Sequence, residues 1–252
     1  MELSEMEFQK QHPRMEIIQA INNQDLVWCL NKTAEIHGHF CPGSAMGVMA
    51  AVYGLGQLEN GILHSDGMEN LMAVVEINAC FADGVQVVSG CTLGNNALVY
   101  RDLGRHAVTF AIRGKESGVR VRVRPDFRSC IEKLVPEFYT LMKEVIVDRE
   151  GDPEAEKAFK KKGREAAFAL IQLPFEELLI SENVVPDLPE YAPITESVVC
   201  PGCGEQVMAT KVVPEGKQAG FCRSCAGTEF RQVEGQGIVV RRQSGSEALP
   251  ME

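Results

Sequence analysis

The chain has 252 residues, of which 45% are hydrophobic and 24% are charged, a balance typical of soluble globular proteins. Its formal net charge of −10 disfavours nonspecific attraction to nucleic acid or to anionic lipid. Residues 1–14 lack the apolar core of a signal peptide, and no apolar run reaches membrane-spanning length, so we expect a cytoplasmic protein with no membrane partner. The nine cysteines include two C-x-x-C pairs, which favours metal binding over a disulfide framework.

Apolar residues at helical spacing predict two helices within residues 15–35, with a break at 22–24. They lead to the segment His37-Gly38-His39-Phe40-Cys41-Pro42-Gly43, which has two imidazoles and a thiol within five residues. Pro42 suits the first position of a helix, because its missing N–H is not needed there. Cys41 is therefore predicted at the N-cap, where free N–H groups and the helix dipole favour a thiolate.

This segment is a candidate metal site with the ligands His37, His39 and Cys41. Three ligands with an open fourth position are typical of catalytic zinc. The alternative is two solvated histidines beside a buried cysteine. The apolar run that follows, through residue 55, predicts a buried helix packed closely against its neighbours.

A predicted strand at 71–77 leads to Cys80 and Asp83. Ligand sites gather at such strand ends, because the loop is exposed while its base is rigid. Cys80 is therefore a further candidate ligand, and Asp83 is a candidate general base. Cys91, in a loop of small residues, is equally well interpreted as a buried turn cysteine or as a functional residue.

Two further strands are predicted at 106–112 and 119–123. Arg120, Arg122 and Arg124 alternate along the second and share one face, which is either a solvated sheet face or an anion-binding wall. Helices are predicted at 128–147, with a kink or a late start at Pro136, and at 154–173. The proline-punctuated stretch 174–197 is interpreted as a linker able to pack in extended form, which gives a core domain at 1–190 and a finger domain at 191–252.

The finger contains two C-x-x-C pairs, Cys200/Cys203 and Cys222/Cys225, separated by eighteen residues. This spacing is typical of a structural four-cysteine zinc site, and the alternatives are two redox dithiols or an iron centre. Few large apolar side chains lie in this part, so metal binding would supply much of its folding free energy. From residue 200 onward, six Lys/Arg balance six Asp/Glu, which disfavours DNA binding and favours partner binding or dimer contact.

Four features of the sequence together resemble the FmdE family of formylmethanofuran dehydrogenase proteins. They are the segment 37–43, the motif Cys80-Phe81-Ala82-Asp83-Gly84 with Gln86, the motif Gly90-Cys91-Thr92-Leu93-Gly94 and the trailing cysteine pairs. The resemblance covers most of residues 15–225. It implies an α+β, thioredoxin-like mixed sheet flanked by helices, plus a small treble-clef zinc finger, in a homodimer. It also implies a core metal on His37, His39, Cys41 and Cys80, and a zinc on Cys200, Cys203, Cys222 and Cys225. The core lacks the C-x-x-C pair of thioredoxin chemistry, so we expect no disulfide exchange.

These observations favour a metal-binding protein of molybdenum or tungsten one-carbon metabolism, with Zn²⁺ in the finger and Zn²⁺ or another transition metal in the core. In an enzymatic version, the core metal would act on an unidentified small-molecule ligand, with Cys41 and Asp83 as the catalytic residues. The first alternative is a non-enzymatic factor that delivers metal, sulfur or cofactor to molybdoenzyme subunits. The second is a zinc-finger regulatory protein.

Overall fold

The computed structural model describes residues 13–58 and 65–242. The chain divides into two compact units, Met1–Pro189 and Glu190–Glu252, one residue away from the boundary expected from the sequence. In the described part of the chain, no helix combines the length and the apolar character needed to cross a bilayer.

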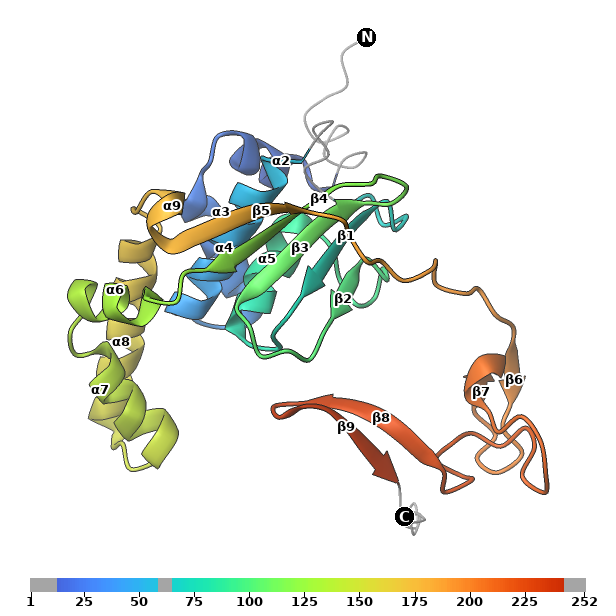
Figure 1. The fold of residues 1–252 in the computed structure, drawn as a ribbon. Coiled ribbons are helices and arrows are strands. Elements are labelled where there is room, and N and C mark those ends of the chain that lie inside the picture. The colour runs from blue at the N-terminus through green and yellow to red at the C-terminus, as the bar shows by residue number, and fades with distance from the viewer. Residues whose placement is uncertain (1–12, 59–64, 243–252) are drawn as a thin grey trace. The chain divides into compact units, whose positions relative to one another are not determined.

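Unit 1 is built on a five-stranded mixed sheet with the strand order β2-β1-β3-β4-β5 (Figure 1). Its strands are β1 (Leu71–Val75), β2 (Leu98–Tyr100), β3 (Ala107–Ile112), β4 (Gly118–Val123) and β5 (Leu179–Val184). β1 and β2 are parallel, as a helical crossover between them requires, and the other pairs are antiparallel. The expected α+β class, with a mixed sheet flanked by helices, is confirmed.

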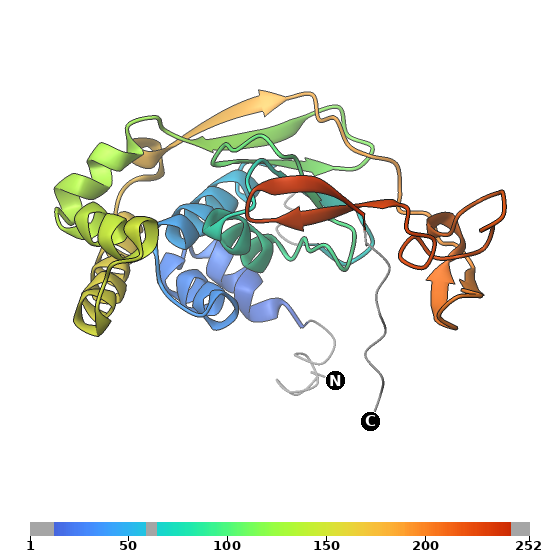
Figure 2. The same cartoon turned by 90° about the horizontal axis from the view of Figure 1, so that it is seen from below.

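Helices α3, α4 and α5 lie together on one face of the sheet, as the two views of Figures 1 and 2 show. The helices of unit 1 are α2 (Met15–Asn22), α3 (Leu26–His37), α4 (Pro42–Leu55), α5 (Cys80–Ser89), α6 (Phe127–Leu134), α7 (Phe138–Met142), α8 (Pro153–Leu170) and α9 (Phe175–Leu178), with a π-helical turn at Lys143–Asp148. α4 is buried along nearly its whole length, as its apolar composition predicts. Pro136 separates α6 from α7, so the helix predicted at 128–147 is broken there.

The stretch from Pro174 to Ser197 is more ordered than a linker. It begins with α9 and continues as β5, which pairs with β4 along six residues. β5 is an edge strand, and edge strands carry polar side chains such as Glu182 and Asn183. The sequence therefore lacked the apolar pattern that identifies a central strand. The expected extended packing is found at 179–184, whereas the linker interpretation was wrong for 175–184, which belong to unit 1.

The arginines of β4 are neutralised by carboxylates of neighbouring segments. Arg120 donates two hydrogen bonds to Glu76, Nε to Oε1 at 2.8 Å and Nη2 to Oε2 at 3.0 Å. Arg105 adds a contact to Glu76 at 2.6 Å, and Arg122 pairs with Glu182 at 2.9 Å. This face is a network of ion pairs, which removes the basis for an anion-binding wall.

Replacing Glu76 with glutamine is expected to lower the free energy of unfolding of unit 1 by about 2 kcal/mol, because Arg120 then loses its bidentate, buried partner and keeps only the exposed Glu182 at 3.4 Å. The Glu76 side chain is only 7% exposed, against 44% for Glu182, so Glu182→Gln is the matched control with an effect below about 1 kcal/mol. Urea unfolding, followed by the fluorescence of Trp28, the single tryptophan, measures the free energy of unfolding of both variants. Equal effects of the two variants would contradict the argument.

The contribution of Glu76 also predicts a pH dependence. Burial alone would raise its pKa, but the hydrogen bonds and charges of Arg120 and Arg105 outweigh burial and lower the pKa below the ordinary 4.5. The stabilisation is therefore fully present above about pH 4.5 and is lost as the pH falls through the lower pKa of the folded state. The stability difference between wild type and Glu76→Gln should shrink on acidification.

Unit 2 consists of strands and turns. Its elements are β6 (Ser197–Val199), β7 (Gln206–Met208), a 3-10 turn (Ala209–Lys211), β8 (Glu229–Glu234) and β9 (Gly237–Arg242). β6 pairs with β7 and β8 pairs with β9, both antiparallel. No α-helix lies in the part of this unit that the structure describes, which ends at residue 242.

Candidate metal centre

The beginnings of α4 and α5 meet because glycines let the two helices touch. A Cβ on Gly84 would lie 2.6 Å from the carbonyl oxygen of Ser44, and a Cβ on Gly47 would overlap the carbonyl of Phe81. A Cβ on Gly43 would lie 2.9 Å from that of Cys80. Small residues at these positions therefore bring the first turns of both helices, with their thiols, into contact.

Three predicted ligands converge at this junction. Cys41 is the N-cap of α4, as predicted, while Cys80 is the first residue of α5 and His37 is the last residue of α3. One ligand atom from each of the three lies within 4.8 Å of the others, and His37 Nε2 is 3.5 Å from Cys41 Sγ. Two sulfurs and one imidazole nitrogen form a donor set that suits zinc and other transition metals.

The Cys41 sulfur is held as a thiolate. The neighbouring Cys80 thiol donates a hydrogen bond to it, and the backbone N–H of Ser44 donates another at 3.4 Å. These contacts outweigh burial and lower the pKa of Cys41 to about 4. The same pairing raises the pKa of Cys80, since its proton serves the thiolate. At neutral pH the site therefore carries one ready anionic ligand, and metal binding would displace the proton of Cys80.

Asp83 orients the histidine of this site. Its Oδ2 lies 2.7 Å from His37 Nδ1, and its Oδ1 accepts a hydrogen bond from Gln86 Nε2 at 3.3 Å. Burial favours a lower pKa for His37, but the bond to Asp83 and the charge of Cys41 prevail and raise it. A carboxylate on one ring nitrogen fixes the tautomer that presents the other nitrogen to a metal. This geometry gives Asp83 a positioning role, and its action as a general base stays a prediction.

We expect Asp83→Asn to weaken zinc binding at this centre by about 10–100-fold, the usual cost of losing an outer carboxylate partner of a histidine ligand. Competition against a chromophoric chelator measures the affinity. Glu35→Gln is the control, because Glu35 is a carboxylate of α3 paired with Lys32 and not with His37. An unchanged zinc affinity in Asp83→Asn would show that the carboxylate does not act through the histidine.

His39 lies beside the converging ligands without joining them. Its ring lies tilted by 33° against the ring of His37 with centroids 4.3 Å apart, and its side chain is exposed at a separate small cleft. It is not in the His37, Cys41 and Cys80 group found in the described part of the chain. A role of His39 as a metal ligand stays a prediction.

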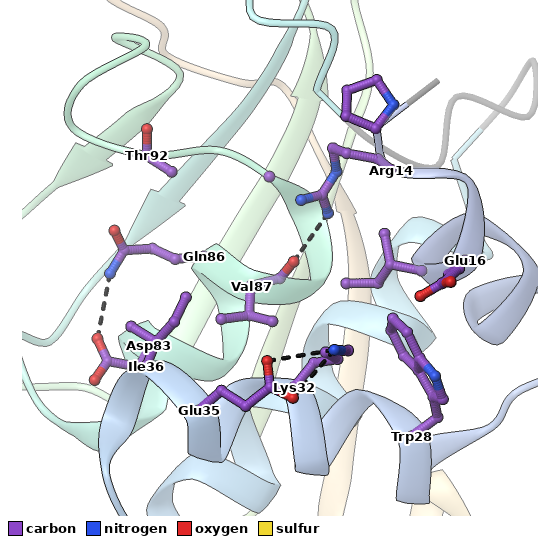
Figure 3. Close-up of a pocket in the computed structure, with 13 residues that line it drawn as sticks. Arg14, Glu16, Trp28, Lys32, Glu35, Ile36, Asp83, Gln86, Val87 and Thr92 are labelled. Carbon is purple, nitrogen blue, oxygen red and sulfur yellow. Dashed lines mark hydrogen bonds and ion pairs between the residues drawn. The ribbon is translucent and has the colours of Figure 1, made fainter. Parts of the chain in front are cut away.

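A cavity of about 570 Å³ opens next to Asp83 (Figure 3). Asp83 and Gln86 project from α5, and Trp28, Lys32 and Ile36 line the cavity from α3. A volume in this range accommodates a small organic molecule. The carboxylate that orients His37 thus also faces a space large enough for a ligand.

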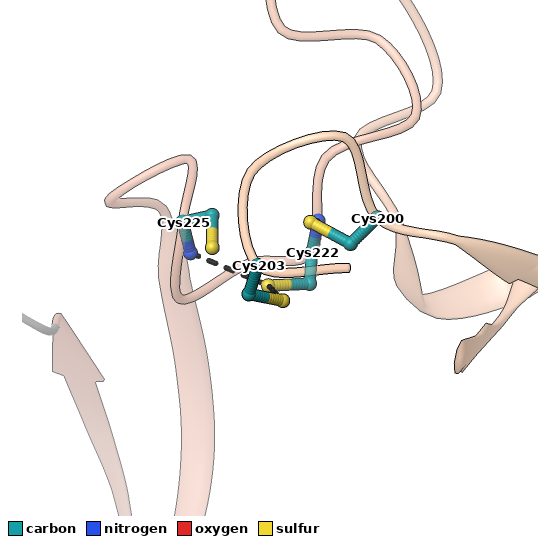
Figure 4. Close-up of side chains that lie close together, drawn as sticks. All are labelled: Cys200, Cys203, Cys222 and Cys225. Atoms are coloured by element: carbon teal, nitrogen blue, oxygen red, sulfur yellow. Dashed lines mark hydrogen bonds between the residues drawn. The ribbon is translucent and has the colours of Figure 1, made fainter. Parts of the chain in front are cut away.

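The four cysteines of unit 2 form a second centre (Figure 4). The β6–β7 hairpin presents Cys200 and Cys203 in a tight turn, and a second turn presents Cys222 and Cys225. All four sulfurs lie within 4.8 Å of one another. The backbone N–H of Cys222 donates to Cys200 Sγ at 3.2 Å, and with other backbone donors it lowers the pKa of Cys200 to about 6. The arrangement fits a closed tetrahedral zinc site.

The remaining cysteines lie outside both groups. Cys29 and Cys91 are fully buried in the core of unit 1, so the structure favours the buried-turn interpretation of Cys91. Ser44 was not among the predicted site residues. Its position three residues after an N-cap is the signal that could have identified it, since that position completes a capping box.

Comparison with known proteins identifies a matching family model, a curated relative and a structural neighbour. A family model described as "FmdE, Molybdenum formylmethanofuran dehydrogenase operon" matches residues 36–180, which include the three converging ligands and exclude the four-cysteine centre. A protein of Archaeoglobus fulgidus named "Probable S-adenosyl-L-methionine-binding protein" is 40% identical over 213 residues, which are 83% of this chain and 55% of that protein. The chain thus spans about half the length of this relative. A tungsten formylmethanofuran dehydrogenase FmdE-like protein from Syntrophus aciditrophicus is similar in structure, with a TM-score of 0.49 and 23% identity over 80% of this chain and 92% of that one.

Proposed function

Because this chain belongs to the FmdE family, we propose that unit 1 is a transition-metal module of molybdenum or tungsten one-carbon metabolism, whose metal keeps one position open for a small ligand. The observation that carries the proposal is the convergence of His37 Nε2, Cys41 Sγ and Cys80 Sγ within 4.8 Å. Two thiolates and one imidazole, with the fourth position free, form a donor set found in catalytic zinc sites.

The surroundings of the donor set support a reactive centre over a purely structural one. Structural zinc is usually closed by four protein ligands, as the four cysteines of unit 2 are able to do. Here three ligands converge, and Asp83 connects His37 to a cavity of ligand size. A metal with an open position would polarise a bound carbonyl or lower the pKa of bound water. His37, Cys41 and Cys80 would hold the metal, and Asp83 would keep the imidazole oriented.

The name of the Archaeoglobus relative does not enter this proposal. Just over half of that protein matches this chain, so the part that binds S-adenosyl-L-methionine can lie in the unmatched portion. The operon named in the family description supports association with molybdoenzyme subunits. Such association and a homodimer remain proposals.

A second candidate function is a carrier that delivers metal or sulfur to a molybdoenzyme without turning over a substrate. The observation that favours it is the Cys41 thiolate, with a pKa of about 4 and a partly exposed side chain, because a thiolate is the form of cysteine that attacks and transfers. A regulatory role of the four-cysteine centre has no comparable support.

Anomalous scattering from crystals of metal-replete protein tests the proposal. Data collected at the absorption edges of zinc, iron, nickel and cobalt should show one metal among His37, Cys41 and Cys80 and another among the four cysteines. Metal in unit 2 alone would overturn the proposal. Stable co-purification with a molybdoenzyme, together with loss of the core metal to that partner, would favour the carrier over the enzyme.

A further inference from the structure

A second, smaller cleft of about 260 Å³ lies between the end of α3 and the middle of α8. His39 borders it, and the same ring contacts the ring of the metal-site residue His37. The lining residues are Ala34, Gly38, His39, Phe40, Lys160 and Arg164. The cleft is thus a neighbour of the metal centre and belongs to neither the centre nor the larger cavity of Figure 3.

The charged residues that line this cleft are all positive. Lys160 and Arg164 contribute two permanent cations, and His39 offers a ring N–H in either neutral tautomer. No lining residue is acidic. Within the described residues, neither Lys160 nor Arg164 forms an ion pair, whereas Lys162 on the same helix pairs with Glu137 and Glu165. The cations at the cleft therefore lack the carboxylate neighbours that neutralise most arginines of unit 1.

The guanidinium of Arg164 is held in place by aromatic packing. Its Cζ lies 5.0 Å from the centroid of the Phe40 ring, and Phe40 packs in turn against Phe168 at 5.2 Å. The absence of a side chain on Gly163 lets this helix approach the Phe40 carbonyl, since a Cβ there would lie 3.3 Å from it. A guanidinium stacked on a ring keeps its N–H edges free for a planar or tetrahedral oxyanion.

We propose that this cleft binds the oxyanion group of a small ligand, a carboxylate, sulfate or phosphate, whose remainder extends past His39 toward the metal centre. The extension of the ligand toward the metal centre rests on the proposed function, whereas binding of the oxyanion group in the cleft does not. The volume admits a group of this size and not a large cofactor. Lys160 and Arg164 would supply the charge-assisted hydrogen bonds and the His39 ring would supply a third donor.

The test is an NMR titration of the full-length, zinc-loaded protein labelled with ¹⁵N. Sodium sulfate, sodium phosphate and sodium acetate are added in separate arms at constant ionic strength and pH. We expect saturable shifts of the Gly38, His39 and Gly163 amides, and the arm with the highest affinity identifies the kind of oxyanion. Lys160→Gln/Arg164→Gln should weaken that binding by at least about tenfold, the loss expected for one charge-assisted hydrogen bond.

The control is Lys157→Gln/Lys161→Gln, which removes the same charge at the same spacing from exposed positions of α8 that do not line the cleft. It should change the affinity by less than about twofold, since distant exposed charges are screened. Equal weakening by both double variants, or shifts that do not saturate, would overturn the proposal. Zinc content measured in parallel distinguishes failure of the oxyanion cleft from failure of the proposed metal centre. Unchanged zinc after Cys41→Ala with anion binding intact would remove the proposed metal centre and leave the cleft.

Discussion

Replacing Cys200 with serine, or removing zinc with a chelator, is expected to unfold unit 2 and leave unit 1 folded. Cys200 is the only buried hydrophobic residue that the structure describes between 190 and 242. Apolar burial therefore contributes little to this unit. Structural zinc binding in small modules has an apparent free energy of about 10–16 kcal/mol. Losing a ligand therefore removes most of the free energy that stabilises the fold of unit 2.

Two probes separate the units in this experiment. Backbone amides of β8 and β9 should lose their dispersed NMR signals, and residues 190–242 should become sensitive to protease. The fluorescence of Trp28, which lies in unit 1, should stay as in wild type. Cys130→Ser is the control, because Cys130 is a partly exposed thiol outside both metal groups. A chelated protein that keeps the β8–β9 signals would show that unit 2 folds without metal.

Replacing Cys41 with alanine is expected to abolish stable metal binding in unit 1. Cys41 supplies the one thiolate already present at neutral pH, and it also accepts the hydrogen bond of Cys80 and completes the N-cap of α4. Loss of an outer partner of a metal ligand costs about 10–100-fold in affinity, and loss of the ligand itself should exceed about a hundredfold. Metal content should fall from two equivalents per chain to one.

Elemental analysis after dialysis gives the number of metal ions bound per chain, and competition against a chromophoric chelator gives their affinity. Cys130→Ala should retain two equivalents. Far-ultraviolet circular dichroism and Trp28 fluorescence verify that the Cys41→Ala variant is folded, which matters because the cap is lost with the ligand. One equivalent in wild type and in Cys41→Ala alike would leave the four-cysteine centre as the only metal site.

Some features of the site were predictable because their causes are local in sequence. The helix start at Pro42, with Cys41 as its cap, follows from proline's fixed φ and missing N–H. The grouping of the four cysteines of unit 2 follows from two tight turns at zinc-ligand spacing. The position of Cys80 after β1 followed from the strand pattern, although it lies in the first turn of a helix and not in a loop.

Other features depend on residues far apart in the chain. Asp83 meets His37 across 46 residues, which gives this candidate general base a further role in orienting a ligand. Arg120 meets Glu76 across 44 residues, and this pairing makes the arginine face an ion-pair network, which argues against the anion-binding alternative. Lys160 and Arg164 line a cleft because α8 packs against Phe40, a residue more than a hundred positions earlier in the chain.

The sequence by itself therefore determined the helix cap, the metal-binding residue types and the four-cysteine spacing, because each depends on neighbours within a few turns of chain, whereas the class of the fold was implied by the family resemblance. Only the tertiary structure decided which charges neutralise each other, which histidine faces the thiols and which basic residues stay free. The physical reason is that ion pairing, burial and ligand convergence depend on distances in space. Here those distances were set by the packing of α3, α4, α5 and α8 and by the glycines that let α4 touch α5.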